Sequence, residues 1–191
     1  MNLLTVWSAD PAIGAAIMTI ELSARAGAGA RPSTWAYVSG VLFLGLAVAF
    51  GATQGNDGDM AIRTVAVLGI AFHLALLPVV LMAPAPFWAT IAGLAWLAID
   101  ITSNSMALAG ASESAATTVR LVGHLPAGVW IIAVSWSLTG IARWTGTALG
   151  VWLAGYTLVA GVVPEAAFMP AMLLMLAWLP ILGRALGQVG R

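Results

Sequence analysis

Few residues in the apolar stretches of this sequence could do chemistry, and Asp100 is the foremost of them. It lies in GLAWLAIDITSNSMAL, with apolar residues before it and a polar run after it. A carboxylate at such a position is costly unless it is protonated, paired or hydrated, so it should face other protein groups rather than lipid. Helical spacing places Trp96, Asp100 and Asn104 on one face of a helix.

His124 is the residue we expect to meet this carboxylate. At about 1.5 Å per residue, Asp100 lies about 20 Å from the inner end of its apolar segment, and His124 about 10 Å from the outer end of the next one. The two are therefore nearly level. Pro126 leaves the carbonyl of Val122 without its helical donor beside His124, and Arg120 lies one turn above His124. The predicted ligand-binding site consists of Asp100, Asn104, His124, Arg120 and Trp96.

An acid and a base at one depth predict one of three roles for this site. The pair could bind or pass a small, mostly apolar molecule with a polar group. It could instead act as an intramembrane acid–base catalyst on a lipid or isoprenoid, with a protonated Asp100 as acid and His124 as base. Alternatively, the two side chains form a structural hydrogen bond that fixes helix register. The sequence does not decide whether the protein is an enzyme, and it identifies no catalytic residue.

His73 and Glu21 are secondary candidates. His73 lies about 18 Å from the outer end of its segment. We interpret it as a packing histidine next to Gly69, because Pro78 frees a backbone carbonyl nearby. Glu21 has Arg25 four residues later, which favours a structural ion pair near the inner interface.

Several kinds of chemistry are excluded by the residues the chain lacks. It has no cysteine, and all seven of its basic residues are arginines, which excludes thiolate catalysis, disulfides and lysine Schiff bases such as that of retinal. No HxxxH or ExxH spacing marks a metal site, and the depths of His73 and His124 differ by about 8 Å, which argues against haem ligation by both. We therefore expect no metal, no cofactor and no nucleic-acid partner.

These residues must be positioned by transmembrane helices. Of the 191 residues, 61% are hydrophobic and 7% are charged, and the mean hydropathy is +1.00, whereas soluble domains carry about a quarter charged residues. We predict an all-α fold, a single polytopic transmembrane helix bundle over residues 1–191. The predicted spans are Leu3–Ala24, Thr34–Ala52, Ala61–Ala83, Phe87–Leu108, Thr117–Ala142, Thr147–Val163 and Ala166–Leu186.

Arginine placement predicts the orientation of these seven spans. With the N-terminus outside and the C-terminus inside, five arginines fall on the cytoplasmic side, and only Arg63 and Arg120 fall outside, which agrees with the positive-inside rule. Asp10 and Pro11 interrupt the first segment, so six spans is the alternative. We expect a multi-pass protein of the bacterial inner, cytoplasmic membrane.

Short connections between the spans predict that sequential helices are antiparallel neighbours. Glycines spaced as GxxxG, at Gly51 and Gly55, at Gly146 and Gly150 and at Gly183 and Gly187, fit internal packing as well as dimerisation. Trp35, Trp88 and Trp144 are interpreted as interfacial anchors. The deeper indoles, whose N–H groups need partners, are Trp96, Trp130, Trp136, Trp152 and Trp178.

The partners expected from these patterns are membrane lipids, a small hydrophobic ligand and other membrane chains. The connections are too short to hold a soluble domain. A bundle with so few titratable groups is more typical of a binding protein or an accessory membrane subunit than of an enzyme. In either case, association into a homo- or hetero-oligomer would take place within the membrane.

Overall fold

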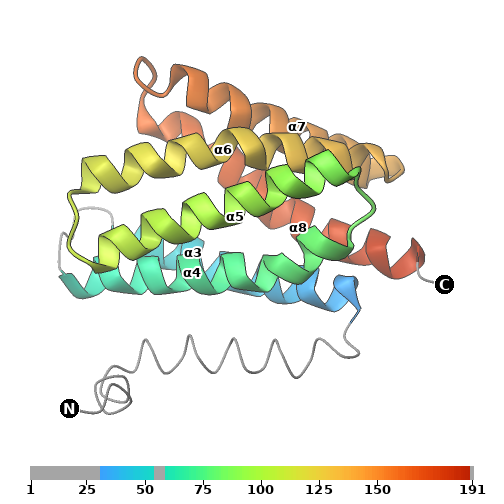
Figure 1. The fold of residues 1–191 in the computed structure, drawn as a ribbon, viewed down its shortest axis with the longest axis horizontal. Coiled ribbons are helices and arrows are strands. Elements are labelled where there is room, and N and C mark those ends of the chain that lie inside the picture. Colours follow the sequence, from blue (N-terminus) through green and yellow to red (C-terminus); the bar gives the residue numbers. More distant parts are fainter. Residues whose placement is uncertain (1–30, 54–58, 190–191) are drawn as a thin grey trace, which may run out of the picture.

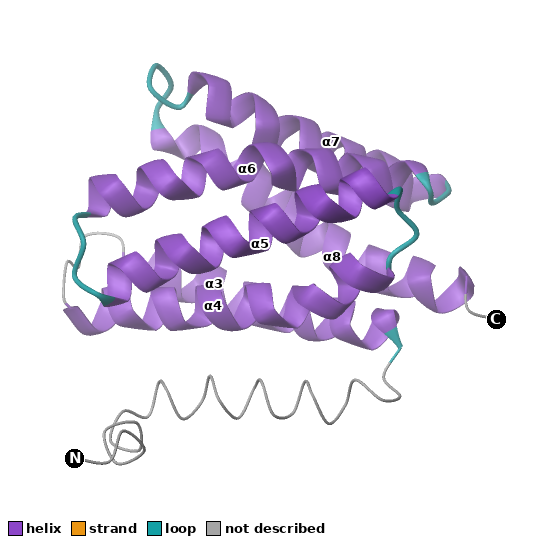
Figure 2. Cartoon of the chain, viewed as in Figure 1, coloured by secondary structure: helices purple, strands orange, loops and turns teal. Residues whose placement is uncertain are grey.

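The computed structural model describes residues 31–53 and 59–189, and in that part of the chain every regular element is a helix (Figures 1 and 2). The predicted first span, with Asp10 and Glu21, lies outside the described residues. The helices are α3 (Pro32–Thr53), α4 (Asp59–Met82), α5 (Phe87–Leu108), α6 (Glu113–Trp136), α7 (Gly140–Val159), the short 3-10 helix η1 (Glu165–Phe168) and α8 (Met169–Val189).

The six long helices pack as a closed ring. Each one contacts the helix before it and the helix after it, and α8, the last, packs against α3, the first in the described part of the chain. Consecutive helices run in opposite directions (Figure 1). The prediction that sequential helices are antiparallel neighbours is therefore confirmed for these six. Apolar side chains fill the centre of the ring, among them the fully buried Trp130 and Trp178.

The antiparallel arrangement gives the bundle two ends. The start of α4, the end of α5, the start of α6 and η1 lie together, and we call this the Asp59 end after the first residue of α4. The end of α4, the start of α5, the end of α6 and the start of α7 lie at the opposite end, which we call the Arg143 end (Figure 1). Asp59 and Arg63 form an exposed ion pair of 3.0 Å at the first of these ends.

The predicted boundaries of the fifth and sixth spans, Thr117–Ala142 and Thr147–Val163, are wrong. α6 ends at Trp136 and α7 begins at Gly140. Gly140 has a φ of 62°, a conformation that glycine adopts without steric cost and other residues rarely adopt. The turn is only three residues long and includes the apolar Leu138, so hydropathy continues across it and conceals the break.

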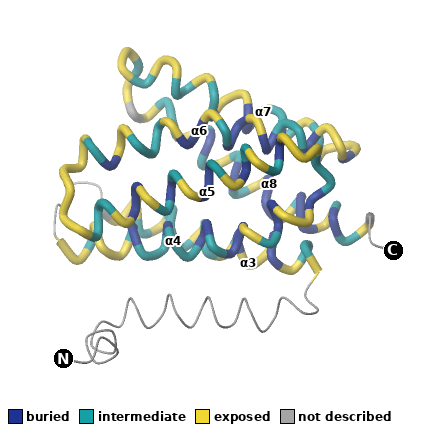
Figure 3. Tube along the Cα trace, in the orientation of Figure 1, coloured by how far each residue is buried: buried dark blue, intermediate teal, exposed yellow. Residues whose placement is uncertain are grey.

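The outer surface of the bundle is strongly apolar. Side chains such as Val41, Phe87 and Leu158, which are 71%, 80% and 77% exposed, point away from the core, and exposed residues line the outer faces of the helices in Figure 3. Five of the described helices are long and apolar enough to cross a membrane, namely those at Pro32–Ala52, Asp59–Met82, Phe87–Leu108, Glu113–Trp136 and Ala166–Gln188. α7 is not among the five.

Two predictions about tryptophan placement are wrong. Trp35, expected at an interface, is 8% exposed and belongs to the core cluster, because α3 packs between α4 and α8 and turns this residue inward. Trp136, expected deep in a span, is 56% exposed because it is the last residue of α6. Trp88 and Trp144 are exposed near helix starts, as predicted.

The GxxxG glycines pack within the chain. A methyl group on Gly183 would lie 3.0 Å from the Tyr37 ring of α3. One on Gly150 would lie 2.7 Å from the carbonyl oxygen of Gly128 in α6, and one on Gly146 would overlap Ser135. Internal packing therefore accounts for these two pairs, whereas Gly51 has no neighbour within 4 Å of an added methyl group and Gly55 lies outside the described residues.

Candidate functional site

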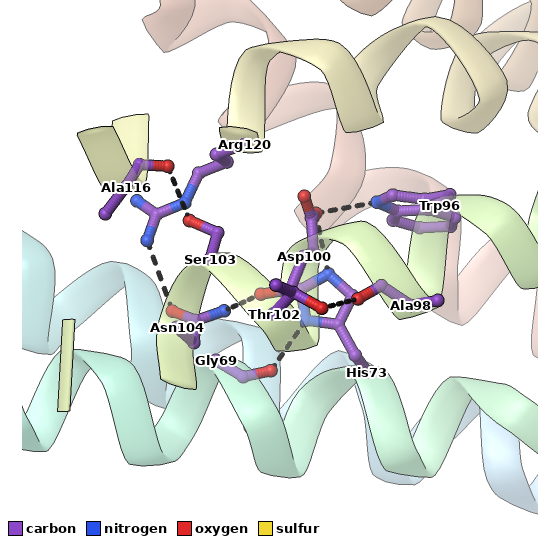
Figure 4. Close-up of polar contacts among 10 residues, drawn as sticks. All are labelled: Gly69, His73, Trp96, Ala98, Asp100, Thr102, Ser103, Asn104, Ala116 and Arg120. Atoms are coloured by element: carbon purple, nitrogen blue, oxygen red, sulfur yellow. Dashed lines mark hydrogen bonds and ion pairs between the residues drawn. The ribbon is translucent and has the colours of Figure 1, made fainter. Parts of the chain in front are cut away.

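Asp100 is buried on α5, at the centre of a network of polar side chains (Figure 4). Trp96 Nε1 donates to Asp100 Oδ2 over 2.8 Å, and Asn104 Nδ2 donates to the Asp100 backbone carbonyl over 2.7 Å. All three side chains are less than 6% exposed. The prediction that Trp96, Asp100 and Asn104 share one helix face is confirmed, and the spacing of four residues is what lets them bond to one another.

The direct partner of Asp100 on another helix is His73 of α4. His73 Nε2 lies 2.9 Å from Asp100 Oδ2, and the other ring nitrogen, Nδ1, lies 2.7 Å from the carbonyl oxygen of Gly69 (Figure 4). The interpretation of His73 as a packing residue beside Gly69 was therefore incomplete. Its ring does bond to Gly69, and it also connects α4 to the carboxyl group of α5.

These two contacts limit the arrangements of hydrogen atoms that His73 and Asp100 can adopt. A backbone carbonyl can only accept, so His73 Nδ1 carries a hydrogen. Nε2 and the Asp100 carboxyl then hold one proton between them, since a bare nitrogen lone pair facing a carboxylate oxygen at 2.9 Å would be repulsive. The pair is either carboxylate with imidazolium or carboxylic acid with neutral imidazole. It has no net charge in either form, which suits a buried site.

Glycines on α4 and α5 bring the two helices close enough for these bonds. A methyl group on Gly69 would lie 2.7 Å from Asn104 Oδ1, and one on Gly93 would lie 2.7 Å from a methyl carbon of Val80. His73 meets Asp100 between these two positions. The three pairs keep one antiparallel register, so a substitution at either glycine would push apart the helices that carry the His73–Asp100 contact.

The same register explains why depth reasoning missed His73. In this register Leu108, the last residue of α5, is level with Val65, so α4 has six further residues, 59 to 64, beyond the end of α5. α4 therefore extends past α5 at the Asp59 end by about 9 Å. Counting residues from the span ends assumed that the ends were level. That assumption placed His73 deeper than Asp100, whereas the extra length of α4 brings the two residues level.

Arg120 and Ser103 join α5 to α6 above Asp100. Arg120 Nη2 donates to Asn104 Oδ1 over 3.2 Å, and Ser103 Oγ donates to the Ala116 carbonyl over 2.7 Å (Figure 4). Arg120 is only partly buried, whereas Asn104 is 3% exposed. Arg120 therefore contacts the site through the Asn104 amide, at the half-buried edge of the network.

The expected hydrogen bond between His124 and Asp100 is not formed. α5 and α6 pack side by side as predicted, and His124 is buried, but its ring stacks on Phe168 of η1 with centroids 5.1 Å apart and planes at 10°. η1 was not predicted as an element, because the sequence around it reads as the start of an apolar span. The aromatic partner of His124 was therefore missed.

Two buried polar atoms at the α5–α6 contact lack a partner among the described residues. They are Asp100 Oδ1 and His124 Nδ1. Oδ1 points at Gly123, where a methyl group would lie 2.6 Å from it, and Gly123 is the residue directly before His124. Unpartnered buried polar atoms are uncommon and call for a physical explanation.

A line of aromatic rings leads from the site into the centre of the bundle. His73 and Trp96 meet edge to face at 5.6 Å, Trp96 and Trp130 lie 5.9 Å apart, and Trp130 and Trp178 lie 6.0 Å apart. The indole N–H groups of Trp130 and Trp178 have no acceptor in the described part of the chain. The expectation that deep indoles find partners holds for Trp96, and for Trp152, which donates to the Ala167 carbonyl.

The described residues contain no group of three or more metal-binding side chains. Comparisons with protein families, curated proteins and solved structures found no match to this chain. Function must therefore be argued from the site itself.

Proposed function

We propose that the protein is a multi-pass membrane protein that binds or passes a small, mostly apolar molecule at the polar site beside Asp100 and His124. The five apolar helices and the exposed apolar surface support the membrane location. The seven-span scheme, with the N-terminus outside and the C-terminus in the cytoplasm of a bacterial cell, belongs to the same proposal. So does an accessory role, in which the bundle serves a larger membrane complex.

Charge placement supports the proposed orientation. Arg31, Arg143 and Arg184 lie at the Arg143 end, while Asp59, Arg63 and Glu113 lie at the Asp59 end. A cytoplasmic Arg143 end agrees with the positive-inside rule. Reporter fusions after Arg31, Asp57, Arg143 and Arg191 should read inside, outside, inside and inside. An outside signal at Arg143 or Arg191 would contradict the scheme.

The observation that carries the binding proposal is the pair of unpartnered atoms, Asp100 Oδ1 and His124 Nδ1. Oδ1 accepts hydrogen bonds in both protonation states allowed by the His73 contact, while Nδ1 donates or accepts according to its tautomer. A hydroxyl group could serve both atoms at once by donating to the carboxyl oxygen and accepting from the ring. The apolar surroundings of α5 and α6 favour a ligand that is otherwise nonpolar.

One observation favours the alternative, an acid–base enzyme acting on a lipid or isoprenoid. The His73–Asp100 contact stores a proton in a buried, uncharged pair, which is the state required of an acid that works away from water. In this alternative His73 replaces His124 as the direct partner of the acid. His124 would then contact the substrate.

The test replaces His124 with phenylalanine. The new ring keeps the stacking on Phe168 and removes the unpartnered Nδ1, so stability in detergent should rise by about 1 kcal/mol. The lipids and small molecules that copurify with the wild-type chain should be lost from His124→Phe, as measured by mass spectrometry of organic extracts. Both the binding protein and the enzyme predict that His124→Phe becomes more stable while it loses the copurifying molecules.

Tyr156→Phe is the matched control, because Tyr156 also packs on Phe168, with centroids 5.1 Å apart, and lies outside the proposed site. It should keep the copurifying molecules. If His124→Phe retains them too, the site binds nothing and the bundle acts as a scaffold or subunit. Untargeted lipidomics of cells with and without the gene then separates the remaining roles, since an enzyme changes the chemical identity of a lipid and a binding protein does not.

A further inference from the structure

A shallow apolar groove of about 640 Å³ runs between α5 and α6 at the Arg143 end, far from Asp100. It is open to the outer surface, since Val129 is 42% exposed and Trp136 is 56% exposed. Two tryptophans line it, Trp88 from α5 and Trp136 from α6. The lining side chains used here are Pro86, Trp88, Val129, Ala133 and Trp136.

A fixed positive charge lies beside the mouth of this groove. Arg143 Nε donates to the Leu138 carbonyl over 2.9 Å, and Nη2 donates to the Trp136 carbonyl over 3.3 Å. The guanidinium carbon also lies 5.7 Å from the centre of the Trp136 ring, within cation–π distance. No carboxylate in the described residues forms an ion pair with Arg143. The Arg143 guanidinium is therefore held in place by backbone carbonyls, and no carboxylate of the described residues neutralises its charge.

We infer that this groove binds one acyl chain of an anionic glycerophospholipid, with the lipid phosphate next to Arg143. The inference rests on the membrane location proposed above. An apolar channel with an unneutralised cation at one end matches a molecule that has a long hydrocarbon chain and a single negative group. The exposed indoles of Trp88 and Trp136 suit the boundary between chain and headgroup, where tryptophan is enriched.

The charge pattern argues for a lipid that is anionic rather than zwitterionic. A zwitterionic headgroup brings its own cation close to the phosphate and would gain little from Arg143. A free phosphate ion would meet the arginine but leave the apolar groove unfilled. Only a molecule with a hydrocarbon chain and a negative group contacts both the apolar groove and Arg143. A soluble headgroup should therefore compete poorly with the whole lipid.

The experiment uses the full chain purified in a neutral detergent and titrated with phosphatidylglycerol or with phosphatidylcholine of the same chains, with bound lipid counted by native mass spectrometry. Phosphatidylglycerol should be preferred by about fivefold, the effect expected of one arginine near a lipid surface. Arg143→Gln should remove this preference. Arg184→Gln, an exposed arginine at the same end on α8, is the matched control and should keep it.

A second variant tests the groove itself. Ala133→Trp fills it and should weaken binding of both lipids, with Ala133→Leu as the smaller substitute if the tryptophan variant loses its helical circular dichroism. Equal losses in Arg143→Gln and Arg184→Gln would show a diffuse charge effect and overturn the inference. So would unchanged lipid binding in the filled groove, or competition by glycerol phosphate as strong as that by the lipid.

Failure here can be distinguished from failure of the proposed function. If the chain is recovered from cells in the aqueous fraction, the membrane location is wrong and both proposals fail. If it is recovered from membranes but shows no preference for phosphatidylglycerol, only the lipid site fails. The polar site beside His124 is tested by its own variant and lies toward the other end of the bundle.

Discussion

Glycines make close helix contacts in several regions of this bundle, and two of these regions place different kinds of side chain against the glycine. At the α4–α5 contact, Gly69 makes room for the amide of Asn104, whereas at the α3–α8 contact Gly183 makes room for the ring of Tyr37. In the first region close approach lets polar groups bond across helices. In the second it serves van der Waals packing. The same small residue therefore permits either polar specificity or tight apolar contact, depending on what the facing helix presents.

The largest effect should come from removing the carboxyl group of the polar region. Asp100→Ala leaves His73 Nε2 and Trp96 Nε1 without their shared partner and opens a small cavity. We expect a loss of about 2–4 kcal/mol of stability, because two buried polar groups become unpaired. Thermal unfolding in detergent, followed by circular dichroism, measures this.

Thr102→Val is the control for the polar region. Thr102 lies on the same helix, is exposed, and bonds only to the Ala98 carbonyl of its own helix (Figure 4). It should change stability by less than about 0.5 kcal/mol. A loss as large as that of Asp100→Ala would mean that the network contributes no more than any polar residue on this helix.

Asp100→Asn sharpens this result. His73 and Trp96 both contact the same oxygen, Oδ2, and an amide can place either its nitrogen or its oxygen there. Nitrogen would serve His73 and oppose the Trp96 donor, while oxygen would do the reverse. Asp100→Asn should therefore lose one of the two bonds and destabilise the bundle less than Asp100→Ala does in the same thermal unfolding measurement.

A pair of glycine substitutions compares the two regions directly and should give the next largest effect. In Gly69→Ala, the new methyl group would lie 2.7 Å from Asn104 Oδ1, so the amide must shift, at a cost of about 1–3 kcal/mol. In Gly187→Ala it would lie 3.7 Å from Ser33 Cβ, an ordinary contact. The higher helix propensity of alanine should then stabilise α8 by up to about 1 kcal/mol. Opposite signs in thermal unfolding support the comparison, and equal losses would refute it.

The smallest effect should come from the rim of the polar network. Arg120 is partly buried and makes a single bond of 3.2 Å to Asn104, so Arg120→Gln should cost about 1 kcal/mol or less. The difference in stability between the wild type and Arg120→Gln should shrink in high salt, because salt screens the partly exposed charge of Arg120. A cost similar to that of Asp100→Ala would place Arg120 at the centre of the network rather than at its edge.

The sequence indicated the helix-borne half of the site, and the reasons are physical. Spacing of four residues on one helix is a local property, so the common face of Trp96, Asp100 and Asn104 could be derived without knowing any neighbour. The relation of His73 to Asp100 depends on how far α4 extends past α5, which hydropathy does not record. The stacking of His124 on Phe168 depends on a short 3-10 helix that hydropathy merged with the following span.

The helices themselves were predictable to a similar degree. Long apolar runs separated by polar loops marked α3, α4 and α5 to within a few residues. The turn between α6 and α7 was missed because it has apolar residues on both sides. Its only local signal is Gly140, and glycine is too common in this chain for one of them to mark a turn.

The closure of the helix ring has a consequence for how the protein is made. Helices emerge from the ribosome in chain order, yet α3 has α8 as one of its two neighbours. Until α8 is synthesised, the face of α3 that carries Ser33, Tyr37 and Gly40 has no protein partner in the described bundle. The contacts of this last-formed seam join Ser33, Tyr37 and Gly40 to Leu179, Pro180 and Gly183, and no ion pair of the described residues lies among them. If the protein folds in a membrane, as proposed above, that face of α3 can stay uncovered until α8 arrives without leaving an ion pair of this seam unformed.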